Sequence, residues 1–188
     1  MGIQALAFFG LKSNTAVRGL LNQSDVNSNT SLITKKISSM SDAEFNTLVS
    51  SILGAYRANS NYTALPDTFI IPDDDFYGFT VSANANFALV TKLEYLEKLF
   101  KGATGNANFK ILPLAYAMSA NNSTVIGLNK NRYVLFRNRA ETIRLDIPVG
   151  FTNTLQNTLN GFDYQSVAFG QFTGAKAYRP LEILYFDY

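Results

Sequence analysis

The chain has 188 residues, 47% of them hydrophobic and 13% aromatic, and its 16 basic and 14 acidic residues leave a formal net charge of +2. This length is enough for one domain with its own hydrophobic core, and so small a charge gives no support for a dedicated nucleic-acid-binding protein. The absence of cysteine and histidine excludes disulfides and thiolate zinc sites and removes the commonest general base. No stretch is long and apolar enough to predict a membrane span, and residues 1–12 lack the basic start of a secretory signal.

The first forty residues carry weak structural signals. A short apolar segment ends at residues 8–10, and a second apolar group, residues 19–22, follows a polar stretch. Residues 27–39 are rich in serine, threonine and asparagine and predict an exposed loop.

The strongest helix signal comes next. Ser41 and Glu44 have the spacing of a capping box, in which each side chain accepts a hydrogen bond from the free backbone N–H of the other residue. The apolar residues after them recur at steps of three and four, as on the buried face of a helix: Phe45, Leu48, Val49, Ile52, Leu53 and Tyr56. We therefore predict a helix over Ser41 to Ala58, with this stripe in the core and not in a cofactor site.

A short buried strand is predicted over residues 65–72, where two prolines limit the length of its pairing. Asp73, Asp74 and Asp75 follow directly and raise the question of a metal site. Three consecutive carboxylates cannot all face one ion from a regular element, and the place of the closing glutamate of a calcium loop is taken by Asn84. The triplet is therefore predicted to form a solvated or helix-leading turn.

A second helix is predicted to begin at Thr91, which stands at capping-box spacing from Glu94. Leucine and phenylalanine form its apolar side, and Gly102 is its expected end. The glycines of residues 102–106 suggest a phosphate-binding loop at first sight. We reject that interpretation because the segment follows a helix instead of a strand and lacks the lysine–serine pair.

Strands dominate the sequence after Phe109. Short apolar runs predict strands over residues 109–114, 124–128, 132–136, 143–147 and 181–186. Two aromatic-rich runs, residues 162–169 and 172–178, are separated by Gly170 and Gln171, a pair that favours a tight hairpin turn.

These elements indicate one α+β unit spanning residues 1–188, with helices gathered early and mainly antiparallel strands late. An enzyme would need a nucleophile, acid or base with a partner, but the sequence has no G-x-S-x-G motif and no carboxylate pair at a telling spacing. We therefore predict no enzymatic activity, no cofactor and no bound metal. A β-rich module for ligand binding or adhesion is an alternative.

Several short motifs point to one family when they are taken in order. The sequence reads R-L-x-I-P at residues 144–148, G-x-x-Y at 161–164 and R-P-L-x-x-L-Y-x-D at 179–187. Earlier in the chain, P-D-T at 66–68 starts a strand after a helix, and G-L-L-N stands at 19–22. In this order the motifs resemble the major capsid proteins of tailed phages and prophages with the HK97-type fold.

The resemblance implies an HK97-like fold and a structural protein whose pentamers and hexamers close into an icosahedral shell around double-stranded DNA. It also implies a place in the virion capsid, assembly in the cytoplasm of a host bacterium, and scaffold, portal or decoration proteins as candidate partners. The matching residues then serve packing and turns. An encapsulin-like compartment shell is the nearest alternative.

The resemblance begins near the end of the family's long spine helix, so the amino-terminal arm, the E-loop and most of that helix have no counterpart in these residues. We therefore expect residues 1–188 alone to form monomers or small oligomers and a longer polypeptide to close into shells. The family also implies a loop at the capsomer axis, for which the candidates by position are Ser119, Ala120, Asn121, Asn122 and Ser123.

Overall fold

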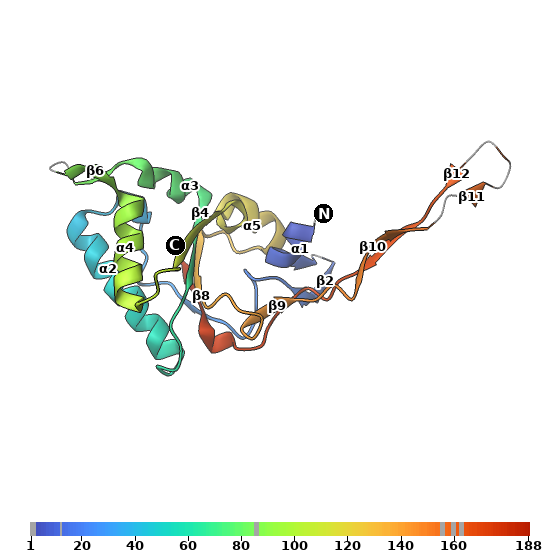
Figure 1. The fold of residues 1–188 in the computed structure, drawn as a ribbon, viewed down its shortest axis with the longest axis horizontal. Coiled ribbons are helices and arrows are strands. Elements are labelled where there is room, and N and C mark those ends of the chain that lie inside the picture. Colours follow the sequence, from blue (N-terminus) through green and yellow to red (C-terminus); the bar gives the residue numbers. More distant parts are fainter. Residues whose placement is uncertain (1–2, 12, 85–86, 155–156, 159–160, 162–163) are drawn as a thin grey trace.

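The computed structural model describes residues 3–11, 13–84, 87–154, 157–158, 161 and 164–188. A five-stranded sheet forms the centre of the protein, with strand order β3-β15-β8-β4-β7 (Figure 1). Its strands are β3 (Asn27–Asn29), β15 (Ile183–Asp187), β8 (Arg132–Phe136), β4 (Thr68–Pro72) and β7 (Lys110–Leu114). The two inner pairings are antiparallel and the two outer pairings are parallel. All the described pairings outside this sheet are antiparallel, as the α+β prediction expects.

The sheet is buried on both faces. All five residues of β4, β8 and β15 are buried. Along β8, Tyr133 and Leu135 point into one hydrophobic cluster, whereas Val134 and Phe136 point into another. Because successive side chains of a strand point to opposite faces, this alternation places one core on each side of the sheet.

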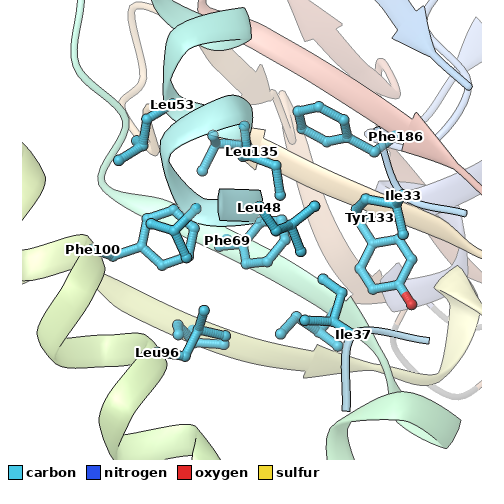
Figure 2. Packing of buried hydrophobic residues seen from close by; sticks show 14 of the residues in the cluster. Ile33, Ile37, Leu48, Leu53, Phe69, Leu96, Phe100, Tyr133, Leu135 and Phe186 are labelled. Carbon is cyan, nitrogen blue, oxygen red and sulfur yellow. The ribbon is translucent and has the colours of Figure 1, made fainter. Parts of the chain in front are cut away.

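Helices α2 (Asp42–Asn59) and α4 (Lys92–Thr104) cover the first face. Ser41 caps α2 and forms the predicted capping box with Glu44. Phe45, Leu48 and Ile52 are 2%, 6% and 1% exposed, which confirms the predicted buried stripe. Figure 2 shows the resulting core, in which side chains from both helices meet those of the sheet.

The start of α4 is confirmed and its end is corrected. Thr91 and Glu94 form the predicted capping box, and the short strands β5 (Ser82–Asn84) and β6 (Phe87–Thr91) lead into it. The helix passes through Gly102 and stops at Gly105, which has the left-handed φ of 65°. Only the second glycine has the backbone conformation that terminates a helix.

The second face of the sheet is covered by α1 (Ile3–Phe9), the segment after it, and the region of α5. A small hairpin, β1 (Gly10–Leu11) and β2 (Asn14–Arg18), follows α1. Gly10 has a φ of 72°, and a Cβ atom there would lie 1.9 Å from the carbonyl oxygen of Val17. Position 10 of the chain therefore requires glycine.

The predicted exposed loop, residues 27–39, is part of the core at two positions. Ile33 and Ile37 are 1% and 0% exposed and belong to the first cluster. β3 pairs with β15, and residues Ile37–Ser39 form the 3-10 turn η1. Most residues of this segment are polar, so its sequence predicts an exposed loop although these two isoleucines are buried.

Residues 119–126 are helical, which corrects the expected loop at 119–123 and the expected strand at 124–128. They form α5 (Ser119–Ile126), which follows the 3-10 turn η3 (Ala115–Ala117) and ends at the left-handed Gly127. Asn122 is fully buried, and its amide nitrogen donates to the carbonyl oxygens of Ala117 and Lys130. These contacts outside the helix stabilise a stretch whose own helix propensity is weak.

Residues 143–177 leave the body as a long two-stranded antiparallel ribbon, here called the arm (Figure 1). From the body outward it consists of three pairs: β9 (Ile143–Leu145) with β14 (Ala175–Ala177), β10 (Val149–Asn153) with β13 (Ala168–Gln171), and β11 (Asn157–Thr158) with β12 (Tyr164–Gln165). Gly170 and Gln171 lie inside β13, so the hairpin turn predicted at these two residues is wrong. The 3-10 turn η4 (Pro180–Glu182) then leads into β15.

Two further short helical turns lie on the chain between β4 and β5. They are α3 (Asp73–Phe76) and the 3-10 turn η2 (Tyr77–Thr80). Gly78 lies close to η1, since a Cβ atom there would lie 2.6 Å from the Cβ of Ser38.

Candidate assembly surface and polar sites

The outer part of the arm is exposed on all sides. Every described residue in 150–154 and 166–173 is exposed. Among them, Phe151, Val167 and Phe169 are 70%, 63% and 49% exposed. A two-stranded ribbon has too few neighbours to bury such side chains by itself. The arm is therefore an exposed apolar surface of the kind that contacts another molecule.

The outer part of the arm, residues 147–173, lacks the charges that usually protect exposed strands. It contains no lysine or arginine, and its one acidic residue, Asp163, lies outside the described residues. Exposed strand edges in monomeric proteins commonly carry lysine or proline, which discourage pairing with another chain. Apart from Pro148 at its inner end, the outer part carries neither.

The base of the arm is fixed by polar contacts and by one close approach. Arg144 forms an ion pair with Asp146 at 2.7 Å, and this hydrogen-bonded pair raises the pKa of Arg144. The backbone N–H of Thr173 donates to the carbonyl oxygen of Asp146 across the ribbon. Gly174 has a φ of 77°, and a Cβ atom there would lie 2.6 Å from Cγ1 of Val17 in β2. The arm thus leaves the body in a defined direction.

The aspartates of α3 stabilise the fold and do not converge on an ion. The carboxylate of Asp75 is fully buried and accepts hydrogen bonds from the backbone N–H groups of Ile37 and Ser38 and from the hydroxyl of Tyr133. Burial, with the negative charge of Asp75 beside it, raises the pKa of Tyr133 far above its ordinary value. Asp74 forms an ion pair with Lys36 at 2.8 Å.

A second buried network joins the neighbouring strands β3, β15 and β8. Arg132 pairs with Asp187 at 2.6 Å, and the guanidinium lies 4.3 Å from the centre of the Tyr185 ring. Ser28 of β3 donates to the same carboxylate. Burial raises the pKa of Tyr185, whose hydroxyl donates to the carbonyl oxygen of Leu20. The network satisfies the charges inside the body, as a buried ion pair requires.

The sequence-predicted axial residues lie at the start of α5, on the side of the sheet that α1 covers. Asn121 and Asn122 are held by backbone carbonyl groups, and the buried Oδ1 of Asn122 has no hydrogen-bond partner among the described residues.

Two hollows lie elsewhere on the body. An apolar hollow of about 280 Å³ lies between α1, β7 and the base of the arm, and a polar hollow of about 470 Å³ lies at the ends of α2 and β8. Sequence reasoning found neither hollow nor the full extent of the arm. The absence of lysine and arginine from 147 to 173 was the available signal for the arm.

The described part of the chain offers no metal site, since no group of three or more aspartates and glutamates converges there. Over the same residues no helix is long and apolar enough to cross a membrane.

Solved structures share this fold. The chain is similar to the capsid of Myoviridae phage XM1, with 16% identity and a TM-score of 0.76, over 98% of this chain and 59% of that chain. It is also similar to the virus-like particle from Pyrococcus furiosus, with 12% identity and a TM-score of 0.58, over 98% of this chain and 62% of that one. A protein of Mycobacterium phage Ogopogo matches with 9% identity and a TM-score of 0.51, over 98% and 62% of the two chains. Comparison with curated proteins finds no match.

The body with a core on each side of its sheet, and the arm that projects from it, therefore form a fold that a solved phage capsid chain shares. The sequence matches the major capsid protein family over residues 1–188, and the chain belongs to that family. This confirms the resemblance seen in the sequence motifs. The chain spans 59% to 62% of the length of the solved chains compared above.

Proposed function

We propose that this chain is the structural unit of an icosahedral phage shell that self-assembles in the host cytoplasm and encloses double-stranded DNA. Membership of the major capsid protein family supports a shell role. The single observation that carries the mechanism is the exposed arm, with apolar side chains at Phe151, Val167 and Phe169. An apolar surface of one copy that fits a different surface of the next copy gives a contact that closes into rings and shells.

Other features of the proposal follow from the family. Residues 1–188 act as one capsid unit in pentamers and hexamers, and α5, which begins at residues 119–123, lies at the capsomer axis. Scaffold, portal or decoration proteins are further partners in this proposal. We infer no enzymatic step, because the buried polar networks described above are satisfied internally and serve folding.

The test is assembly of the purified protein. Both residues 1–188 and the gene product that contains them are studied by light scattering and negative-stain microscopy. Closed particles of uniform size from either polypeptide support the proposal. If both stay monomeric under every assembly condition, the shell function is wrong.

The role of the arm is tested with a variant that carries Phe151→Ser and Phe169→Ser. Because both side chains are exposed, we expect the free energy of unfolding to change by no more than about 0.5 kcal/mol for each, while assembly is abolished. Tyr77→Ser is the matched control, since Tyr77 is 70% exposed but lies on η2 in the body. Equal assembly of the arm variant and the control would contradict the proposed mechanism.

A compartment shell is the second candidate, favoured by the fold similarity to the Pyrococcus furiosus virus-like particle. The two functions differ in their contents. Particles purified from the native host and treated with nuclease should retain double-stranded DNA if the shell is a phage capsid, and protein cargo without DNA if it is a compartment.

A further inference from the structure

The polar hollow of about 470 Å³ is built where three chain segments meet. These segments are the end of α2 with the residues that lead into β4, the end of α4 with the residues just after it (Thr104 and Asn106), and the chain just after β8. Three arginines line it, Arg57, Arg137 and Arg139, together with one acidic residue, Asp67. The hollow is therefore positively charged in a protein whose net charge is only +2.

The positive charges of these arginines are not neutralised by acidic side chains inside the hollow. Among the described residues, Arg57 and Arg139 have no acidic partner, while Arg137 lies 3.7 Å from Glu182. The only carboxylate in the lining is partly occupied, since Oδ1 of Asp67 accepts from the backbone N–H of Asn138 at 2.7 Å and from Thr68 Oγ1 at 2.9 Å. Guanidinium donors in the hollow therefore exceed the acceptors available to them.

A strained turn places an aromatic ring beside one of these arginines, Arg57 of α2. Asn61 and Tyr62 have positive φ angles of 51° and 60°, which residues other than glycine rarely adopt. The turn brings the Tyr62 ring to 5.5 Å from the guanidinium of Arg57. The Tyr62 backbone N–H also donates to the carbonyl oxygen of Arg57. Backbone strain of this kind clusters at functional sites.

The end of α2 does not cancel this positive charge. A helix C-terminus carries partial negative charge on its last free carbonyl groups. Here the turn supplies donors to them, because the backbone N–H groups of Ser60, Asn61 and Tyr62 bond to the carbonyl oxygens of Tyr56, Ala58 and Arg57. With these carbonyl groups satisfied, the arginines dominate the hollow.

We infer that this hollow binds a phosphate group. Arginine presents a planar fork of N–H donors that matches the oxygens of phosphate, and it stays charged at every physiological pH. A tetrahedral phosphate anion would satisfy the donors that the protein leaves open. The phosphate comes either from free phosphate or from the backbone of DNA, and only the second source rests on the proposed function.

The first test measures inorganic phosphate binding to the purified chain by calorimetry, with chloride at equal ionic strength as the reference. Arg57→Gln with Arg139→Gln should weaken binding by about tenfold or more, because the charge-assisted hydrogen bonds of two guanidinium groups are removed. Lys98→Gln with Lys130→Gln is the matched control, since it removes the same charge at two exposed positions outside the hollow. The control should bind phosphate as the wild type does.

The second test identifies the source. Binding of duplex DNA is measured over a range of salt concentrations for the same two variants. If the hollow holds backbone phosphates, the arginine variant should lower the salt slope by about one unit for each DNA phosphate that it no longer neutralises, and the control should not. An unchanged slope with weakened phosphate binding identifies free phosphate as the ligand.

The inference is overturned if the wild type shows no phosphate binding beyond the chloride reference, or if both variants weaken it equally. It is also overturned if the arginine variant blocks assembly without changing phosphate affinity, because the hollow then holds a carboxylate of another copy. Failure of shell assembly alone leaves the phosphate measurement standing, so the two proposals can fail separately.

Discussion

The body and the arm use the same kind of strand in opposite environments. In the body, all five residues of β8 are buried, with apolar side chains on both faces. In the arm, all four residues of β13 are exposed, including Phe169. The body is therefore complete as a folded unit, whereas the arm has apolar side chains that only another molecule can cover.

Because the two regions differ in burial, we expect the stability of the fold and the assembly of copies to depend on different side chains. Side chains in the body determine whether the chain folds, and side chains in the arm determine what the folded chain contacts. Four substitutions test the separation, in order of the expected effect.

The largest effect is expected from Phe69→Ala in β4. Phe69 is 0% exposed and packs against Phe100 and Tyr133, so its removal leaves a cavity and should cost about 3–5 kcal/mol. Phe151→Ala in the arm should cost less than about 0.5 kcal/mol. Urea unfolding measures both. Equal destabilisation by the two variants would show that the arm is part of the cooperative fold.

Tyr133→Phe should cost about 1.5–3 kcal/mol, because it removes a hydrogen bond to the buried carboxylate of Asp75. The change tests whether the polar network in the body acts on stability alone. Urea unfolding gives the destabilisation, and Tyr77→Phe, at a 70% exposed side chain whose hydroxyl has no hydrogen bond among the described residues, is the control. A Tyr133→Phe variant as stable as the control would mean that the hydrogen bond contributes nothing net.

Gly174→Ala tests the junction between the two regions. The left-handed φ of 77° alone should cost about 1–2 kcal/mol, and the new Cβ would also meet Val17. Val17→Ala removes the second cost and leaves the first. Thermal unfolding of both single variants and the double variant should therefore show partial rescue. If the double variant is destabilised by the sum of the two single effects, the close approach to Val17 carries no cost.

The smallest effect concerns acid stability. The hydrogen bond from Lys35, with those from the backbone and side chain of Ser41, lowers the pKa of Glu44 from 4.5 to about 2. A lowered pKa in the folded state means that this contribution is present above pH 4.5 and disappears as the pH falls toward 2. Between pH 4.5 and about 2, the free energy of unfolding of Glu44→Gln should therefore change less with pH than that of the wild type. A variant profile parallel to that of the wild type would show that the Glu44 carboxylate is not the source.

Local signals in the sequence predict their elements correctly. Both capping boxes could be predicted because the four residues from Ser41 to Glu44, and from Thr91 to Glu94, contain all the chemistry of a helix start. The strands β8 and β15 could likewise be predicted, because the apolar run that indicates each strand lies within the strand itself. Motif order was enough to indicate the family.

Several of the errors involve partners that lie outside the element itself. Gly170 has the sequence signal of a hairpin turn. Its strand, β13, instead pairs with Val149–Asn153, some twenty residues earlier in the sequence. The helix at 119–126 depends on Asn122, whose hydrogen bonds reach Ala117 and Lys130. The phosphate hollow draws its arginines from two separate segments, so no local motif could reveal it.

The position of β15 has a consequence for synthesis of the protein. β15 lies between β3 and β8, so residues 183–187 fill the middle of the sheet and pair with residues 27–29 from the opposite part of the sequence. A growing polypeptide on the ribosome emerges amino end first, so it cannot complete this sheet until those residues are made. We expect nascent chains to wait in an incomplete form, with β8 unpaired along one edge, and subunits to become competent for assembly only after residues 183–187 have emerged from the ribosome.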